Sequence, residues 1–310
     1  MGAARNQETS EAARLCELRQ LIARHATPDG STAIDGVLVS AATEPREPAA
    51  SSSGTVMALI AQGTKRLACG SRVYEYTAGQ YLVASIDLPI TGHYSQASPE
   101  RPALGFGLVL RPDRIASLLL DAGPNGSLAG PAHVVPPALG VADAPDELLD
   151  AAVRMLCLLD DPADHAILAP MIEREILWRL LRGPLGETVR QTALADSSLT
   201  SISQAVRWIT DHYNEPFRVA DLARACSMST SAFHRNFQAV TASSPLQFQK
   251  QIRLHKARLM LIADTDVATA GYRVGYDNPS QFSREYRRQF GLPPGRDVRR
   301  LRTDRAPAAA

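Results

Sequence analysis

The sequence has few of the residues that build metal centres or disulfide frameworks. Its 310 residues include four cysteines, far apart in the chain and without a Cys-x-x-Cys pair. They are Cys16, Cys69, Cys157 and Cys226. Metal sites need three or four converging ligands, and disulfide-stapled domains need closely spaced cysteines. We therefore expect reduced thiols, a cytoplasmic protein, and neither a metal nor another cofactor.

Long apolar runs and histidine pairs are also missing. No stretch approaches the roughly 18 apolar residues of a membrane-spanning helix. Residues 1–24 lack the apolar core of a signal peptide. The histidines are isolated, and no Ser-His-Asp, Cys-His or paired-carboxylate arrangement is visible. The sequence thus predicts no membrane segment and no catalytic residues.

The charges are unevenly distributed, although the formal net charge is only +1. From Ser201 onward, 17 Lys and Arg stand against 9 Asp and Glu, whereas before it there are 16 against 23. A basic part joined to an acidic part is expected when only one part contacts phosphates.

The stretch Val267–Pro294 has the pattern of a helix-turn-helix. Ala268 is small enough for close helix packing, and Gly275 occupies the position of a tight turn. Asn278 can cap the next helix, whose first position suits Pro279. One aromatic stripe then follows at a spacing of four residues: Phe282, Tyr286 and Phe290. A helix-turn-helix buries such a stripe and presents the other face to the major groove.

The same pattern occurs about fifty residues upstream, beginning at Phe217. Ser227 takes the turn position where glycine is commoner, and Ser229 is the expected N-cap. Phe233 and Phe237 form the matching core pair. The sequence therefore predicts two helix-turn-helix units.

The predicted recognition helices, Thr230–Val240 and Asn278–Phe290, carry polar faces. We expect these faces to enter successive major grooves, about 34 Å apart. In the first helix the expected DNA-binding residues are Thr230, Ser231, His234, Arg235 and Gln238. In the second they are Asn278, Ser280, Gln281, Ser283, Arg284, Arg287 and Arg288. The expected phosphate contacts are Lys256, Arg258 and Arg299.

Two such units, joined by one predicted helix over 245–262, resemble the DNA-binding domain of the AraC/XylS family of transcription regulators. The stretch VGYDNPSQFSREYRRQFGLPP is close to that family's signature. The resemblance covers residues 201–302 and implies sequence-specific binding to double-stranded promoter DNA. Activation is the commoner role in this family, and it implies contact with RNA polymerase. Ser227 and Gly271 depart from the family's pattern, and we expect local effects on stability from both.

Short strand-like segments separated by turns predict a compact β-barrel or sandwich before this domain. They are TVMALIAQ, KRLAC, RVYEYT, QYLVASIDLPIT and ALGFGLVL. A helix is expected over Glu11–His25, and a loop over Thr43–Gly54. The region from Ile34 to Leu120, including ASPERP at 97–102, resembles the cupin-like N-terminal barrel of one AraC subgroup.

In the wider family such barrels bind a small effector, so the resemblance implies an effector pocket here. The expected pocket residues are Tyr74, Tyr76, Tyr81, Val83, Ser85 and His93. Cys69 is a candidate redox or electrophile sensor, since some family members are thought to sense aldehydes through cysteine. One alternative is a metal-dependent cupin enzyme, although the barrel holds a single histidine. Another is a constitutive DNA-binding protein whose barrel is a scaffold.

Helices are also expected over 111–121, 144–160 and 164–182, with a loop over 123–140 and a linker over 185–199. Their apolar stripes suit a cover for the barrel, and the resemblance implies pairing into a homodimer. The predicted class is α+β and multidomain: a cupin-like barrel, a helical dimerisation segment and an all-α domain with two helix-turn-helix units. The predicted boundaries are a helical arm at 1–31, the barrel at 32–120, the dimerisation segment and linker at 121–200, the DNA-binding domain at 201–302 and a disordered tail at 303–310.

Overall fold

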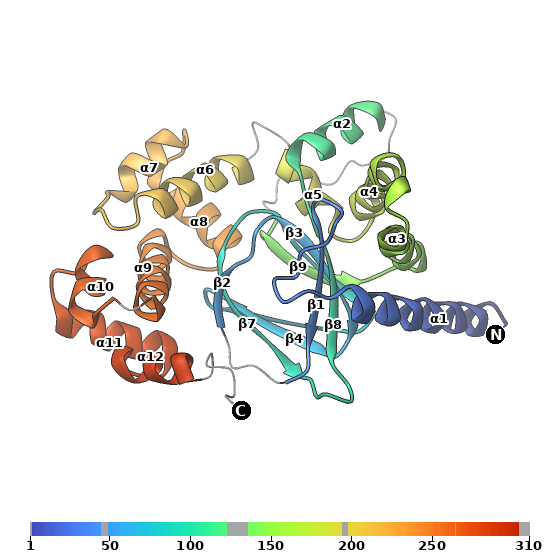
Figure 1. Cartoon of the computed structure of the whole chain (residues 1–310). Helices are drawn as coiled ribbons and strands as arrows, with labels where there is room; N and C mark the ends of the chain where they lie inside the picture. Colours follow the sequence, from blue (N-terminus) through green and yellow to red (C-terminus); the bar gives the residue numbers. More distant parts are fainter. Residues whose placement is uncertain (1, 45–48, 123–135, 194–197, 264, 304–310) are drawn as a thin grey trace. The chain divides into compact units, whose positions relative to one another are not determined.

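The computed structural model describes residues 2–44, 49–122, 136–193, 198–263 and 265–303. The chain divides into two compact units: residues 1–201 with 239–242, and residues 202–238 with 243–310. The first unit combines β-sheets with helices, and the described part of the second is helical (Figure 1). The predicted α+β class is confirmed. Most of the tail predicted over 303–310 and of the loop predicted over 123–140 lies outside the described residues.

Two antiparallel sheets form the barrel of the first unit. The larger sheet has the order β1-β8-β3-β6-β9 and the smaller one β2-β7-β4-β5. The larger sheet contains β1 (Val37–Ala42), β3 (Val56–Gln62), β6 (Gln80–Ala84), β8 (Ala103–Val109) and β9 (Leu139–Asp143). The smaller one contains β2 (Ala49–Ser52), β4 (Thr64–Cys69), β5 (Arg72–Thr77) and β7 (Pro89–Gln96).

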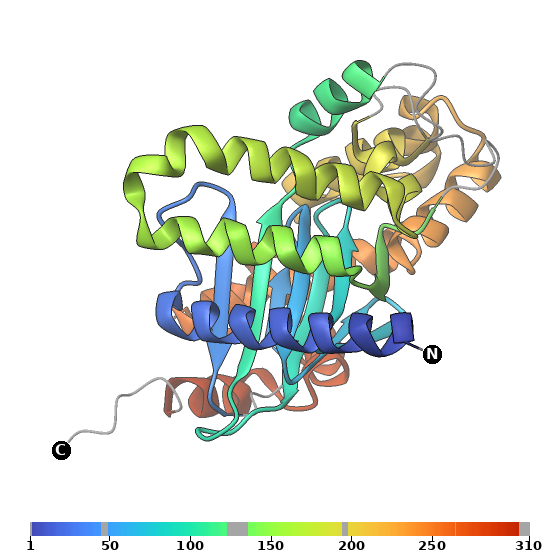
Figure 2. The ribbon, with the colours of Figure 1, turned by 90° about the vertical axis from the view of Figure 1, so that its right-hand side faces the viewer.

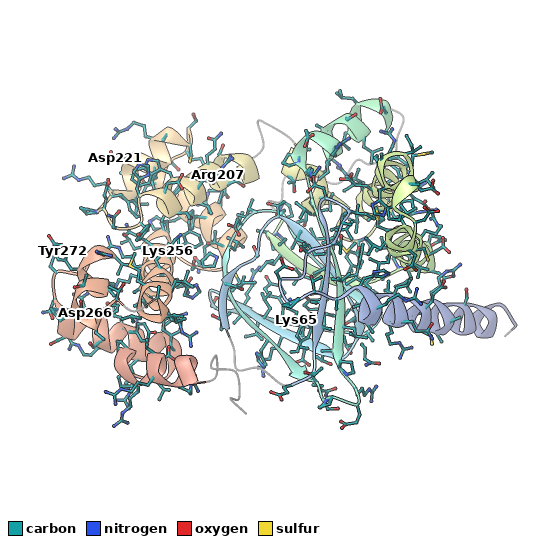
Figure 3. All side chains as sticks on the ribbon, in the orientation of Figure 1. Lys65, Arg207, Asp221, Lys256, Asp266 and Tyr272 are labelled. Carbon is teal, nitrogen blue, oxygen red and sulfur yellow. The ribbon has the colours of Figure 1, made fainter. Side chains whose placement is uncertain are left out.

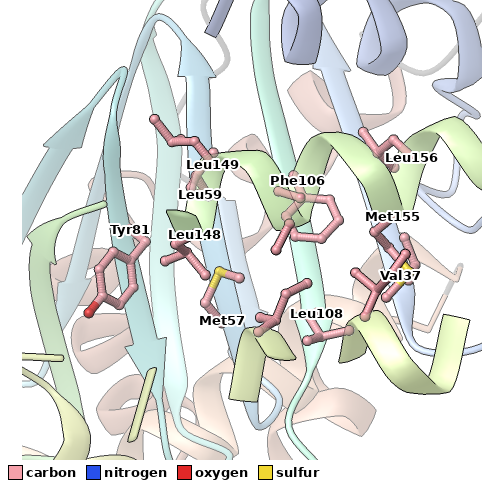
Figure 4. Close-up of a cluster of buried hydrophobic side chains, with 14 of the residues drawn as sticks. Val37, Met57, Leu59, Tyr81, Phe106, Leu108, Leu148, Leu149, Met155 and Leu156 are labelled. Carbon is pink, nitrogen blue, oxygen red and sulfur yellow. The ribbon is translucent and has the colours of Figure 1, made fainter. Parts of the chain in front are cut away.

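Helices cover the outer face of the larger sheet, as Figure 2 shows. They are α1 (Gly2–His25), α3 (Asp146–Cys157) and α4 (His165–Arg182). The helices α2 (Pro112–Ala122) and α5 (Gly186–Ala193) pack against each other and against α4. Two 3₁₀ turns, Leu158–Asp160 and Pro162–Asp164, connect α3 to α4. Apolar side chains of α1, α3 and α4 pack with alternate residues of β1, β3, β6 and β8 into one core (Figure 4). Each fully buried leucine of this core contributes about 1.5–3 kcal/mol to folding.

Three strands were not predicted from the sequence: β1, β2 and β9. The predicted loop Thr43–Gly54 contains β2, and β9 begins at the end of the predicted loop 123–140. All three are edge strands of their sheets, and β1 adds only an isolated bridge from Leu38 to Ser31 on its outer side. An edge strand needs neither length nor strong apolar alternation, which explains the missing signal.

One predicted strand was wrong, and one predicted linker contains a helix. The segment QYLVASIDLPIT is not one strand, because it contains β6 of the larger sheet and the start of β7 of the smaller sheet. The predicted linker 185–199 contains α5, in which Thr188 and Val189 are buried. Burial of these two side chains gives the segment a packing role that its modest apolar content did not reveal.

The second unit is built from seven helices in the described residues. They are α6 (Ser198–Asp211), α7 (Val219–Ala225), α8 (Thr230–Thr241), α9 (Pro245–Ile262), α10 (Val267–Arg273), α11 (Pro279–Phe290) and α12 (Pro294–Thr303). The predicted connecting helix is α9, which begins with a capping box formed by Ser244 and Gln247. Among the described helices, none combines the length and apolar character that crossing a membrane requires.

Candidate nucleic-acid interface and ligand cavity

The first helix-turn-helix consists of α7, a turn and α8. Ser227 adopts a left-handed φ of 54°, as the predicted turn position requires. The Ser229 hydroxyl accepts a hydrogen bond from the Ala232 amide at 3.2 Å, which confirms the predicted cap. Phe233 and Phe237 are fully buried. The predicted DNA-binding residues of α8 are all exposed: Thr230, Ser231, His234, Arg235 and Gln238.

The second helix-turn-helix repeats this geometry with α10 and α11. Gly275 has a φ of 87°, and the Asn278 side chain accepts hydrogen bonds from the Ser280 and Gln281 amides. Gly271, rather than Ala268, is the site of close helix packing. Ala268 is exposed, whereas a Cβ on Gly271 would lie 3.0 Å from the Phe282 ring.

The predicted face of α11 is polar and accessible. Its exposed residues are Asn278, Ser280, Gln281, Arg284, Arg287 and Arg288, and Ser283 is half-buried. The Gln281 amide donates to Glu285 at 3.2 Å, and the Arg284 Nε donates to the Ser280 carbonyl at 3.3 Å. Amide and guanidinium groups of this kind can form paired hydrogen bonds with adenine and guanine edges.

The predicted phosphate contacts divide into two classes. Lys256 and Arg299 are exposed, and the Lys256 ammonium lies 5.9 Å from the centre of the Tyr213 ring. Arg258 is buried, and its guanidinium donates two hydrogen bonds to the Asp297 carboxylate, at 2.8 and 3.0 Å. The prediction for Arg258 was therefore wrong: a side chain committed to a buried ion pair cannot reach a phosphate.

A cavity of about 360 Å³ lies between the two sheets of the barrel. Residues of β1, β3 and β8 line one side, and residues of β4, β5 and β7 line the other. The walls are mainly apolar, and the polar side chains that project into them include Ser40, Lys65, Tyr76 and Tyr94. The volume suits a small organic ligand.

Two glycines of β8 create part of this space. Gly105 and Gly107 face the cavity, while Phe106 between them points to the helix-covered core. A Cβ on Gly105 would lie 2.9 Å from both the Ser40 and Tyr94 hydroxyl oxygens. These two oxygens are hydrogen-bonded to each other at 2.6 Å. Any larger residue at position 105 would therefore intrude on the polar part of the cavity.

Lys65 is the basic residue of the cavity lining (labelled in Figure 3). Its ammonium lies 5.3 Å from the centre of the Tyr94 ring, a cation–π contact that holds it beside the Tyr94–Ser40 pair. Tyr76 is buried in the same lining, and burial raises the pKa of its hydroxyl far above its usual value. The lining thus contains one cation, several hydroxyls and one carboxylate, that of Asp29, which already accepts hydrogen bonds from Thr27 and Ser31.

Of the predicted pocket residues, Tyr76 lines this cavity. Tyr81 and Val83 instead belong to the core beneath the helices, because they occupy the opposite face of the larger sheet. Ser85 is buried after β6 and donates to the Ala138 carbonyl at 3.3 Å. The prediction that these three line the pocket was wrong, since strand alternation alone does not tell which face is inner. Tyr74 and His93 are half-buried, and neither lines the cavity.

Among the described residues, no group of three or more His, Cys, Asp or Glu side chains could hold a metal ion. Cys69 is buried, and burial raises its pKa to about 12. A thiol with this pKa is protonated at neutral pH and therefore a poor nucleophile.

A larger cavity, of about 700 Å³, lies beside Trp208, Phe217 and Leu222 in the second compact unit, but none of the predicted recognition residues lines it.

Comparison with known proteins assigns the family. Residues 33–188, half of the chain, match the model of the AraC-type transcriptional regulator N-terminus, and residues 222–300 match a helix-turn-helix domain model. The chain belongs to the AraC-type transcriptional regulators. This AraC-type protein is 31% identical over 152 residues to the HTH-type transcriptional activator RhaS of Salmonella arizonae, covering 48% of the chain and 54% of that relative. RhaS of Citrobacter koseri is 27% identical over 150 residues, covering 48% and 53%. The chain thus spans about half the length of the curated relatives it matches.

The fold of this AraC-type protein is shared with ToxT of Vibrio cholerae. The structure of ToxT with a bound unsaturated fatty acid has a TM-score of 0.50 and 10% identity, covering 85% of this chain and 95% of ToxT. ToxT bound to (E)-4-(8-methylnaphthalen-1-yl)but-3-enoic acid also has a TM-score of 0.50, with 11% identity and coverage of 86% and 100%. At this identity the likeness concerns the fold alone.

Proposed function

We propose that this protein is a sequence-specific regulator of transcription, acting in the cytoplasm, that binds promoter DNA through α8 and α11. The observation that carries the proposal is the pair of capped helices, each with a buried aromatic stripe and an exposed polar face. The excess of basic over acidic residues after Ser201 supports the same surface.

Binding to the DNA that flanks its own gene tests this proposal. Fluorescence anisotropy at several salt concentrations, with unrelated competitor DNA, separates specific from non-specific binding. Arg284→Ala should weaken binding to the specific site by about 1–3 kcal/mol and relax the base preference there. Arg288→Ala should weaken all sequences alike and lower the salt slope by about one. An equal loss on specific and random DNA with Arg284→Ala would contradict its base-reading role.

The barrel cavity is the proposed site of a small-molecule effector. The mainly apolar lining holds the Lys65 ammonium and several hydroxyls, and its one carboxylate, Asp29, is already hydrogen-bonded to Thr27 and Ser31. This lining favours a small molecule with an apolar body and one acidic group. The ligands in the two ToxT structures, an unsaturated fatty acid and a substituted butenoic acid, agree with this chemistry. Binding would favour one arrangement of the chain over another and so change its affinity for DNA.

A thermal-shift screen of aliphatic and aromatic carboxylic acids, each paired with its primary amide, tests the cavity. A ligand of the folded state raises the unfolding temperature, because it stabilises that state alone. Lys65→Met should abolish the preference for the acid over the amide. Arg66→Met is the matched control, because Arg66 is the exposed neighbour on the same strand. Acids and amides that stabilise the protein equally would contradict the role of Lys65.

We also propose that the protein forms a homodimer through α4 and, as an activator, contacts RNA polymerase. Ile167 and Met171 lie one turn apart on α4 and are 69% and 63% exposed, which leaves an apolar strip uncovered. The name of the RhaS relatives supports activation. Ile167→Glu with Met171→Glu should shift the mass measured by analytical ultracentrifugation from dimer to monomer.

A further inference from the structure

One side of α9 is hydrogen-bonded to the turn that leads into the first helix-turn-helix and to the second helix-turn-helix. Three of its residues take part: Gln249, Lys250 and Arg253. Arg253 follows Gln249 by four residues and Lys250 by three, the spacings at which side chains on a helix are neighbours. This side of α9 therefore links the turn before the first helix-turn-helix to the second helix-turn-helix.

The contacts on the side of the first helix-turn-helix are made to the turn between α6 and α7, which leads into α7. The Gln249 amide donates to the Glu215 carbonyl at 2.6 Å. The Arg253 Nε donates to the Tyr213 carbonyl at 2.6 Å, and one terminal nitrogen donates to the Glu215 carbonyl at 3.3 Å. Backbone carbonyls are the acceptors, so these bonds hold the path of the turn itself.

The contacts with the second helix-turn-helix are made to the turn between α10 and α11 and to α11 itself. The other terminal nitrogen of Arg253 donates to the Gly275 carbonyl at 2.8 Å. Gly275 also packs directly against the turn between α6 and α7, since a Cβ on it would meet the Asn214 carbonyl oxygen. Lys250 adds an ion pair to Glu285 of α11 at 3.0 Å, and the Tyr276 hydroxyl donates to the same carboxylate at 2.8 Å.

We propose that Arg253 is a positioning residue that fixes α8 and α11 relative to each other, and thereby sets the spacing of the two DNA half-sites that the protein accepts. The inference rests on the proposed DNA binding. A guanidinium is planar and its donors have fixed directions, so one Arg253 side chain defines the separation of three carbonyls on two turns. A lysine at this position retains the charge but not that geometry.

The test measures spacing preference with the full-length protein. The probes are the best operator selected from random DNA, the same operator with one base pair inserted or removed between its half-sites, and a single half-site. One base pair turns the second half-site by a tenth of the duplex turn, so it takes the second helix away from its base edges. The wild-type protein should bind the altered spacings at least about tenfold more weakly, because a good base contact contributes about 1–3 kcal/mol.

Arg253→Lys and Arg253→Gln should bind all three spacings with nearly equal affinity while retaining affinity for the single half-site. Gln249→Leu removes one bond to the Glu215 carbonyl and no charge, and it should relax the preference partly. Arg224→Gln is the control, because Arg224 is exposed on α7 and its ion pair with Asp221 is local. If Arg253 variants lose the same factor on every spacing, or if wild type accepts every spacing equally, the inference is overturned. A wild-type protein that binds no selected DNA overturns the proposed function, and the inference with it.

Discussion

The two helix-turn-helix units use the same backbone turn with different residues. After α7, the amides of Ser227 and Met228 donate to the carbonyls of Arg224 and Ala223, and Gly275 and Tyr276 repeat this pattern after α10. Both are left-handed caps of the Schellman type. Ser227 is exposed, whereas a Cβ at Gly275 would meet a backbone oxygen. Glycine is therefore required in the second turn by a neighbour, and favoured in the first by backbone conformation alone.

The cores beneath the two recognition helices differ in the same way. Phe233, Phe237 and Phe248 form an aromatic cluster under α8. Under α11, Tyr286 is fully buried and its hydroxyl donates to Asp297, which also accepts two bonds from Arg258. The first core depends on burial of apolar surface, and the second also depends on an ion pair shielded from water. The stability of the second helix-turn-helix should therefore be the more sensitive to loss of a single charge.

The largest expected effect is that of Asp297→Ala. The change leaves the Arg258 guanidinium buried without its carboxylate, so the second helix-turn-helix should lose about 3–5 kcal/mol of unfolding free energy. Chemical unfolding followed by circular dichroism measures it. Tyr286→Phe, which keeps the ion pair and removes one hydrogen bond, should cost only about 1 kcal/mol. Similar losses for both variants would refute the role given to the buried pair.

Gly275→Ala should rank next. The new methyl group has to enter space occupied by the Asn214 carbonyl, and the residue has to keep a φ of 87°. Strain and overpacking together should cost about 3 kcal/mol of unfolding free energy. The same measurement on Ser227→Ala is the comparison. A small change is expected there, because serine and alanine are strained alike in the left-handed conformation.

The second helix-turn-helix should also lose stability in mild acid because of His255, whose ring lies against Phe290 of α11. Burial, together with the nearby Arg258 charge, lowers its pKa to about 4 from the usual value of 6.5. The unfolded chain therefore binds a proton more readily than the folded one, and stability is lost as pH falls from about 6.5 to 4, by up to about 3 kcal/mol. His255→Leu should remove that part of the pH dependence. An unchanged pH profile in the variant would contradict the burial argument.

Ser227→Gly has the smallest expected effect and the opposite sign. Glycine adopts the left-handed conformation without strain, so the first helix-turn-helix should gain about 0.5–1 kcal/mol of unfolding free energy. A small rise in the unfolding temperature would measure it. A loss of stability would mean that the Ser227 side chain makes a contribution beyond its turn position.

Local signals in the sequence were sufficient for the helix-turn-helix units. Caps at Ser229 and Asn278, the turn at Gly275 and aromatic stripes at a spacing of four residues depend on neighbours along the chain, so they are visible before folding. The partner of Arg258 was not visible, since it lies 39 residues away and no local pattern pairs them. The same limit applies to the pocket, where alternation defined two faces of each strand but not which face was inner.

On one strand of the barrel, residues that border the cavity alternate with residues of the helix-covered core. On β8, Gly105 and Gly107 border the cavity, and Leu104, Phe106 and Leu108 belong to the helix-covered core. A substitution at either glycine alters the shape of the cavity while the residues that hold the sheet to its helices stay in place. Duplicated genes could therefore diverge in the shape of this cavity through single codon changes on the inner face, with the scaffold inherited intact.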